Sequence, residues 1–187
     1  METRIIFFVG KPGCGKGDQT KLLSEKTGWP VYSSGDLFRA IAEDDSPVGK
    51  KVQEENYAGI LQPHWFATYL FLKTLFSIAS DTGAIFDGFC RKVPETQLVI
   101  DSLGWLDRPF SVVHLQVSDE EIIRRLALRK GIEGRADDNV VEKRLKEYLE
   151  YTVPAIELFR SKEVLIEIDG ERAREPIAED IRAVLKI

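Results

Sequence analysis

Short runs of apolar residues alternate along the chain with longer segments in which apolar residues recur every three or four positions. The short runs are rich in aliphatic, aromatic and β-branched side chains, which is typical of strands covered on both faces of a parallel sheet. They predict strands at residues 4–9, 30–32, 84–87, 111–117 and 164–168. The longer segments predict helices at residues 17–27, 36–43, 48–58, 64–79, 95–103, 119–130, 140–161 and 174–186.

This alternation predicts an α/β fold with a central parallel sheet of five strands and right-handed crossovers. The chain contains no linker, internal repeat or low-complexity tract, so we expect residues 1–187 to form a single domain. Asp36 and Ser118 are the predicted N-caps of two helices, and Glu121 follows Ser118 at the spacing of a capping box. The polar, glycine-containing stretch Lys130–Asn139 predicts a mobile loop.

A glycine-rich segment stands between the first predicted strand and the first predicted helix. It runs Gly10-Lys11-Pro12-Gly13-Cys14-Gly15-Lys16-Gly17 and fits the pattern G-x-x-x-x-G-K. Glycines there let consecutive backbone N–H groups converge on an anion, and the N-terminus of the following helix adds partial positive charge. The segment therefore predicts a site for a nucleoside triphosphate, with Lys16 reaching the β- and γ-phosphates.

An aspartate ends the third predicted strand, in the segment Phe86-Asp87-Gly88-Phe89-Cys90-Arg91. Ligands of open α/β sheets bind beyond the carboxyl ends of the strands. In phosphate-loop enzymes an acidic group at this place holds Mg²⁺. Asp87 is therefore the predicted ligand of Mg²⁺, through water, and the planar guanidinium group of Arg91 suits a phosphate.

Composition narrows the choice of partners. The net charge of -5 and the lack of a basic stripe argue against nucleic-acid binding, so a protein that binds polyphosphate must gather its positive charge locally. The apolar runs are too short to span a membrane, and we expect no membrane partner and no signal segment. Two cysteines do not make a disulfide framework, which favours a cytoplasmic location.

Five motifs in a fixed order resemble the nucleoside monophosphate kinase family, and its short-lid adenylate kinase branch in particular. They are Gly10–Gln19 for G-x-P-G-x-G-K-G-T-Q, Ser33–Arg39 for S-T-G-D-hydrophobic-hydrophobic-R, Gly59–Pro63 for G-x-hydrophobic-V-P, Asp87–Arg91 for D-G-F-P-R and Gly134–Asn139 for G-R-x-D-D-N. The resemblance implies a three-layer P-loop NTPase fold with a helical segment that binds the monophosphate (33–63) and a short lid (129–139). It implies transfer of the γ-phosphoryl group of ATP–Mg²⁺ to a nucleoside monophosphate, most simply AMP, by a monomer.

The resemblance also implies roles for single residues. ATP would be held by Gly13, Cys14, Gly15, Lys16, Gly17, Asp18, Arg125 and Arg172, the last two at its adenine. The monophosphate would be held by Ser34, Arg39, Leu61, Gln62, Gly88, Arg91 and Glu95. The transferring phosphoryl group would be stabilised by Lys16, Arg91, Arg129, Arg135 and Arg144, and Asp87 would hold Mg²⁺ through water. Because only about nine residues fill the lid and neither cysteine is near it, no structural zinc is expected.

Several residues depart from the family pattern. Asp18 replaces a threonine and would either point to solvent or lie beside the α-phosphate, where it would weaken binding or recruit a cation. Cys90 replaces a proline that commonly follows a cis peptide bond, so the loop is expected to be trans and differently shaped. Cys14 and Cys90 would form either a redox pair or two separately buried small residues. The interval Asn139–Arg144 is two residues short, which would turn Arg144 by about 200° on its helix.

Glu95 stands where the family has a glutamine or asparagine that contacts the acceptor base. A carboxylate could bind the adjacent N1–H and N2–H₂ donors of guanine, while Ser34 leaves room for the extra amine and Gln62 replaces an apolar residue. Alternatively, Glu95 is a solvated acid at a helix start after Pro94. The alternatives to AMP are therefore GMP or a pyrimidine monophosphate as acceptor, or a nucleotide-binding module that has lost catalysis.

Overall fold

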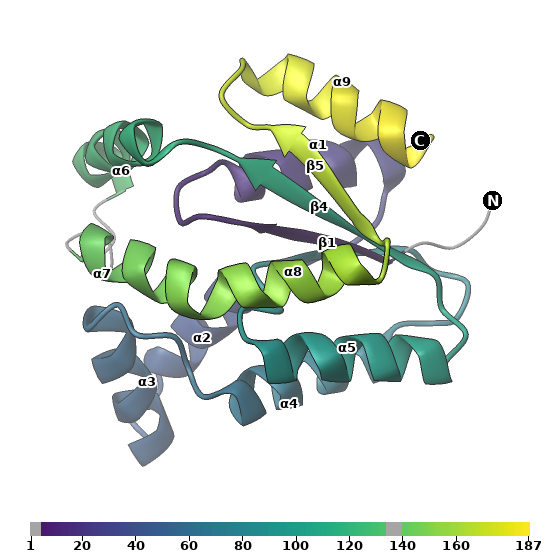
Figure 1. Ribbon diagram of the computed structural model, residues 1–187. Helices are drawn as coiled ribbons and strands as arrows, with labels where there is room; N and C mark the ends of the chain where they lie inside the picture. Colours follow the sequence, from purple (N-terminus) through teal and green to yellow (C-terminus); the bar gives the residue numbers. More distant parts are fainter. Residues whose placement is uncertain (1–4, 134–139) are drawn as a thin grey trace.

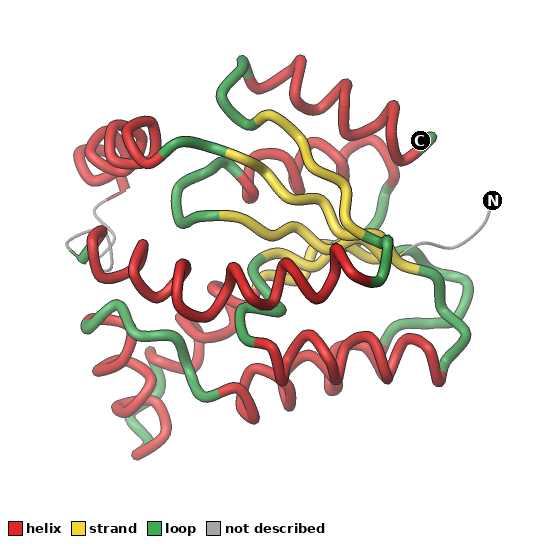
Figure 2. The backbone as a smooth tube through the Cα atoms, in the orientation of Figure 1, coloured by secondary structure: helices red, strands yellow, loops and turns green. Residues whose placement is uncertain are grey.

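The computed structural model describes residues 5–133 and 140–187, and only the backbone of residues 129–133. Its sheet is built from β1 (Ile5–Gly10), β2 (Val31–Ser33), β3 (Ala84–Asp87), β4 (Phe110–Gln116) and β5 (Leu165–Asp169). The order across the sheet is β2-β3-β1-β4-β5, and every neighbouring pair is parallel. Figure 2 shows the strands in yellow among the helices in red. The predicted α/β fold with a central parallel five-stranded sheet is therefore confirmed.

Helices connect the strands and cover both faces of the sheet (Figure 1). They are α1 (Lys16–Thr27), α2 (Ser34–Ala42), α3 (Pro47–Tyr57), α4 (His64–Ser77), α5 (Val93–Trp105), α6 (Asp119–Glu133), α7 (Val141–Glu147), the π-helical segment η2 (Tyr148–Thr152), α8 (Val153–Ser161) and α9 (Arg174–Leu185). Helices α1 and α9 lie on one side of the sheet, and α4, α5 and α8 lie on the other (Figure 1). No helix in residues 5–133 and 140–187 is long and apolar enough to cross a membrane.

Successive side chains of β1 enter two separate cores. Ile6 and Phe8 pack in one cluster with residues of α1, α6 and α9, such as Leu23. Phe7 packs in the other cluster with residues of α4, α5 and α8, such as Phe71 and Phe159. This alternation follows from the period of two in a strand, and it explains why β1 is apolar at every position up to Val9.

A smaller apolar cluster joins α2, α3 and α4 at one end of the molecule. It contains Phe38, Val52, Ala67 and Leu70, and it is distinct from the two cores on the sheet. The hydroxyl group of Ser34 ties this unit to the sheet by donating to the Gly88 carbonyl oxygen at 2.7 Å. The segment that follows β2 is therefore packed as a local unit beside the carboxyl ends of the strands.

The register of the strands brings the loops with chemical groups to one edge of the sheet. Phe8 of β1 pairs with Asp87 of β3 on one side and with Val113 of β4 on the other. The glycine-rich segment follows β1 directly, and the Asp87–Arg91 segment leaves the end of β3. Because parallel strands end at the same edge, these two segments lie next to each other.

The predicted helix caps are corrected at two places. Ser33, and not Asp36, caps α2, because the Ser33 hydroxyl oxygen accepts the backbone N–H of Asp36 at 3.2 Å. Ser118 does accept the N–H of Glu121, at 3.4 Å, but the return bond of a capping box is absent. The Ser118 N–H donates instead to Glu171 at 2.7 Å.

One predicted segment bound is wrong, and one predicted helix has an irregular interior. The loop expected from Lys130 begins later, because α6 continues to Glu133; residues 134–139 lie outside the described part of the chain. The helix expected over 140–161 contains the π-helical segment η2. Pro154 lacks a backbone N–H and cannot close the regular bond to the preceding turn, which favours a wider turn before it.

Replacement of Phe86 by alanine should lower the free energy of unfolding by about 3–5 kcal/mol. Phe86 is fully buried, and its ring lies 5.0 Å from that of Phe7 and 5.3 Å from that of Phe71, centroid to centroid. Urea denaturation followed by circular dichroism measures the change. Phe76→Ala is the matched control, because Phe76 is 62% exposed and its loss should cost at most about 0.5 kcal/mol. Equal losses in the two variants would contradict this account of the core.

Candidate active site

The glycine-rich segment forms a tight loop between β1 and α1. Gly10 and Gly15 have φ angles of +145° and +99°, which glycine adopts without strain, and Gly15 is the residue before α1. A Cβ atom at Gly10 would lie 2.8 Å from the Leu115 carbonyl oxygen of the neighbouring strand. The loop therefore closes directly over the sheet and leads into the N-terminus of α1, where backbone N–H groups can bind an anion.

The Lys16 side chain crosses the inside of this loop. Its Nζ donates to the carbonyl oxygens of Gly10 at 2.8 Å and Lys11 at 2.9 Å. Cys14 is buried beside it, with Sγ 3.5 Å from the Lys16 Nζ. The ammonium group is thus held at the base of the loop by neutral acceptors, without a carboxylate partner among these bonds.

Arg125 of α6 joins the loop to the end of β5. Its guanidinium group donates to Glu121 at 2.6 Å, to the Cys14 carbonyl oxygen at 3.1 Å and to the Gly170 carbonyl oxygen at 2.8 Å. Arg172, two residues beyond Gly170, pairs with Asp180 of α9. Both predicted adenine-contacting residues therefore lie on the same side of the phosphate loop.

Two arginines lie on the other side of the loop, toward α2. Arg39 pairs with Asp36 one turn earlier on α2. The Arg91 Nε donates to the Gly88 carbonyl oxygen at 2.6 Å, and its Nη2 lies 3.5 Å from the Ser34 hydroxyl oxygen. Residues from two separate segments of the chain, 34–39 and 88–91, thus meet at one place.

A cavity of about 800 Å³ runs between these two groups of residues. Seven basic and four acidic side chains of the described chain line it, although the whole protein carries a net charge of -5. The basic ones are Lys16, Arg39, Arg91, Arg125, Arg144, Arg172 and Arg174. The positive charge that a polyphosphate site requires is therefore gathered in one cleft, as the sequence predicted.

A second cavity of about 330 Å³ lies between α2, α3 and the start of α5. It shares Arg39, Arg91 and Arg144 with the larger cavity, so the two are continuous. Glu95 lines it and is only 5% exposed, so the alternative of a solvated acid at a helix start is wrong. Burial raises the pKa of the Glu95 carboxyl, against the opposing effect of hydrogen bonding to Arg91.

Asp87 lies at the end of β3, on the lining of the large cavity. Its Oδ2 would be 3.9 Å from a Cβ atom placed on Gly17, so the carboxylate faces the first turn of α1. Burial raises the pKa of Asp87, while the charges of Lys16 and Arg91 lower it. Among the described residues no group of three or more acidic, histidine or cysteine side chains is arranged to hold a metal ion. One hard oxygen ligand fits Mg²⁺ that keeps waters and phosphate oxygens as its other ligands.

The structure brings most of the predicted site residues together. Lining one or both cavities are Gly13, Cys14, Gly15, Lys16, Gly17, Asp18, Ser34, Arg39, Leu61, Gln62, Asp87, Gly88, Arg91, Glu95, Arg125, Arg144 and Arg172. Arg144 thus faces the cleft despite the short interval before it. Arg129 lies in α6 with only its backbone described, and Arg135 lies outside the described residues.

The structure shows where two departures from the family pattern, Asp18 and Cys90, are placed. Asp18 is exposed in the first turn of α1, at the edge of the cavity. The peptide bond before Cys90 is trans, as predicted, and Cys90 has a φ of +62°. Cys14 and Cys90 are both free and buried, in the two cores on opposite faces of the sheet, so they are separate small residues and not a redox pair.

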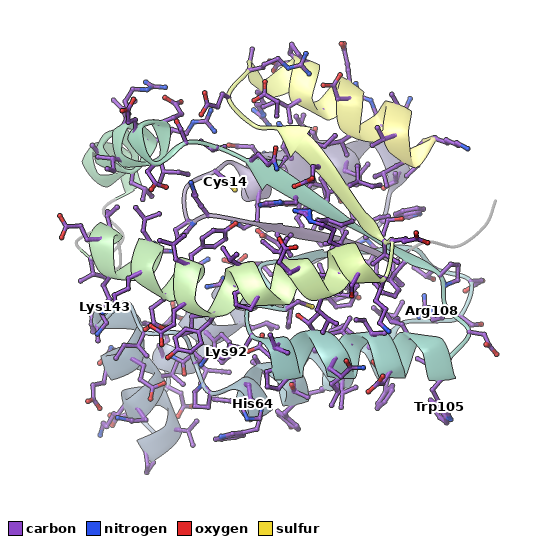
Figure 3. All side chains as sticks on the ribbon, viewed as in Figure 1. Cys14, His64, Lys92, Trp105, Arg108 and Lys143 are labelled. Atoms are coloured by element: carbon purple, nitrogen blue, oxygen red, sulfur yellow. The ribbon has the colours of Figure 1, made fainter. Side chains whose placement is uncertain are left out.

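Several residues that hold the site together were not predicted from the sequence. The Thr152 hydroxyl group donates to the Arg91 carbonyl oxygen at 3.1 Å, and Glu147 accepts the N–H of Leu61 at 3.1 Å. The Lys92 Nζ donates to the carbonyl oxygen of Gln62 at 3.1 Å (labelled in Figure 3). These contacts join residues 30 to 86 positions apart, and no motif near any of these residues indicated them.

Comparison with known proteins agrees with this geometry. The family model described as adenylate kinase matches residues 8–164. An adenylate kinase from Maricaulis maris (strain MCS10) is 36% identical over 187 residues, covering 97% of this chain and 98% of the relative. An adenylate kinase from Clavibacter michiganensis subsp. michiganensis (strain NCPPB 382) is 33% identical over 186 residues, covering 98% of this chain and 92% of the relative. One from Prochlorococcus marinus (strain MIT 9211) is 35% identical over 188 residues, covering 99% and 98%. The chain therefore belongs to the adenylate kinase family, and it is an enzyme of the nucleoside monophosphate kinase class.

Proposed function

We propose that this enzyme transfers the γ-phosphoryl group of ATP to AMP and forms two molecules of ADP. The bond between the γ-phosphorus and the bridging oxygen of ATP breaks, and a bond to a phosphate oxygen of AMP forms in line with it. The observation that carries the proposal is the single cleft that joins the phosphate loop to Arg39 and Arg91. Such a cleft can hold two nucleotides end to end, and the names of the relatives support AMP as acceptor.

The donor half of the cleft suits ATP. The N–H groups of residues 13–17 and the N-terminus of α1 would bind the phosphates, and Lys16 would turn from its carbonyl partners toward the β- and γ-phosphates. Arg125 and Arg172 would lie at the adenine. Mg²⁺, held by Asp87 through water, would offset the charge of the phosphates when bound.

The acceptor half suits a monophosphate. The guanidinium groups of Arg39 and Arg91 would bind its phosphate, because a planar fork matches two phosphate oxygens. Its base would enter the smaller cavity beside Glu95. Arg144 lines both cavities and would therefore lie between the two phosphates, where negative charge builds up during transfer. Arg129 and Arg135 are proposed for the same task from the family resemblance.

The organisation of the chain belongs to the same proposal. Residues 1–187 would form one kinase domain, with residues 33–63 binding the monophosphate and residues 129–139 forming a short lid. The monomeric state is proposed from the family resemblance. Two free, buried cysteines support a cytoplasmic location.

A coupled assay of ADP formation from ATP–Mg²⁺ across AMP, GMP, CMP, UMP and dAMP, at about pH 7, tests the proposal. We expect AMP to be used with the highest kcat/KM, because the family and the cleft both favour it. GMP turnover far above AMP turnover would overturn the choice of acceptor. Nucleotide binding by calorimetry with no transfer to any monophosphate would instead identify a binding module that has lost catalysis.

A further inference from the structure

The smaller cavity contains an unusual group for its surroundings. Apolar side chains, among them Phe38, Ala42 and Phe89, form one part of its walls, and polar and charged side chains form the rest. Glu95, in the first turn of α5, reaches this cavity with 5% of its surface exposed. A carboxyl group in such a place is costly unless it is hydrogen bonded or neutral. The protonation state of Glu95 therefore depends on the polar and charged groups of the cavity and on any nucleotide bound there.

Two other buried polar side chains, Ser34 and Gln62, line the same cavity and already donate their protons in hydrogen bonds within the protein. The Ser34 hydroxyl donates to the Gly88 carbonyl oxygen at 2.7 Å. The Gln62 Nε2 donates to the Val52 carbonyl oxygen at 3.3 Å and to the Asn56 side chain at 3.2 Å. Glu95 accepts the N–H of Arg91 through Oε2 at 2.9 Å. Of these three side chains, Glu95 alone can change from acceptor to donor, by taking up a proton.

The binding of a monophosphate would change the balance of charges around Glu95. The titratable or charged groups that line the cavity with Glu95 or act on its charge are Arg39 of α2, Glu43 directly after α2, Tyr57 of α3, Cys90, Arg91 and Lys92 before α5, and Arg144 of α7. Burial raises the pKa of Glu95, while Arg91 and Lys92 lower it. A bound phosphate would neutralise Arg39 and Arg91, so the neutral form of Glu95 gains further when an acceptor is present.

We propose that the protonation state of Glu95 selects the acceptor base: the carboxylic acid binds adenine, and the carboxylate binds guanine. This inference rests on the proposed function, because it concerns the acceptor of the same transfer. It adds GMP as a second acceptor whose use rises with pH.

The two forms of the carboxyl group match the two bases in opposite ways. The acid donates its O–H to N1 of adenine and accepts the 6-amino group through its carbonyl oxygen. The carboxylate accepts N1–H and N2–H₂ of guanine. In each wrong combination two donors or two acceptors face each other within a confined site, which is disfavoured. Binding of AMP to the ionised form therefore takes up one proton from the solvent, and binding of GMP to the acid releases one.

The first test compares kcat/KM for AMP and for GMP in the wild-type enzyme from about pH 6 to about pH 9. Both acceptors have the same phosphate and meet the same arginines, so those titrations cancel in the ratio of the two constants. The ratio of AMP to GMP should fall about tenfold per pH unit, because one form is required by each base. A ratio that does not change with pH, in an enzyme that does use AMP, would overturn the inference and leave the proposed function standing.

Glu95→Gln supplies the matched variant. A neutral amide both donates and accepts, so the ratio should stay in favour of AMP and become independent of pH. Glu25→Gln, an exposed carboxyl on α1 away from both cavities, should keep the wild-type slope. A wild-type slope in Glu95→Gln would show that another group is responsible and would overturn the inference.

Binding calorimetry gives a readout that does not depend on turnover. Each nucleotide is titrated in two buffers with different heats of ionisation, and the numbers of protons exchanged are compared. AMP and GMP should differ by about one proton in the wild type and by none in Glu95→Gln. Equal proton exchange in the wild type would contradict the inference. If no monophosphate is phosphorylated, the proposed function fails, while this measurement still decides whether Glu95 distinguishes the bases.

Discussion

Lys16→Ala should reduce kcat by roughly 10³-fold or more while leaving the protein folded. The ammonium group of Lys16 lies at the base of the phosphate loop, where a transferring phosphoryl group would arrive. Its loss removes a fixed positive charge at the position where negative charge develops during transfer. Steady-state kinetics with ATP–Mg²⁺ and AMP measure the effect, and thermal unfolding checks the fold.

The structure also indicates that Lys16→Ala should lower the stability of the fold only slightly. The two carbonyl oxygens that Lys16 contacts, of Gly10 and Lys11, lie on the lining of an open cleft or beside it, so water can replace the ammonium group. Lys21→Ala is the matched control, because Lys21 is exposed on the same helix and is absent from the cavity lining. A Lys16→Ala enzyme that retains a tenth or more of wild-type turnover, roughly, would contradict the assigned role.

The strands were the most predictable part of the fold. The clearest of them, β1 and β3, begin with compact apolar runs, and β1 is apolar on both faces because each face has its own helical layer. The glycine-rich loop was predictable for a similar reason, since its backbone conformation requires glycine at Gly10 and Gly15. Where local chemistry determines the structure, the sequence alone is sufficient.

Contacts between distant segments were not predictable in this way. Ser33 and Asp36 are both good N-cap residues, and the sequence alone does not decide between them. Ser33 caps the helix in the structure, next to Ser34, whose hydroxyl group bonds to Gly88. The π-helical segment before Pro154 ends at Thr152, which bonds to the Arg91 carbonyl oxygen. In both cases the segment is bonded to a residue more than 50 positions away, and its immediate neighbours in the sequence give no sign of that bond.

The candidate site shows the same division. Motifs identified the loop, Asp87 and the arginines, because each occurs in a short run of characteristic residues. The burial of Glu95 could not be read from its neighbours, since a glutamate after Pro94 is equally typical of a solvated first turn. It is buried because α2 and α3 fold over the start of α5 and close a cavity around it.

Arg91→Ala should lower kcat/KM for the monophosphate by roughly 10²-fold or more, while the Kd for ATP stays within about threefold. The Arg91 guanidinium group lies on the acceptor side, within reach of Ser34 and Gly88, whereas the backbone of Arg91 makes the bonds to Glu95 and Thr152. Alanine keeps those backbone bonds, so the loop should hold its shape and the loss should be confined to phosphate binding. Arg108→Ala is the control, because that arginine also donates to a backbone carbonyl oxygen, of Thr82, but lies outside both cavities (Figure 3). An equal loss of ATP affinity and acceptor use in Arg91→Ala would mean that the two halves of the cleft are not separate sites, and the end-to-end arrangement of the substrates would have to be abandoned.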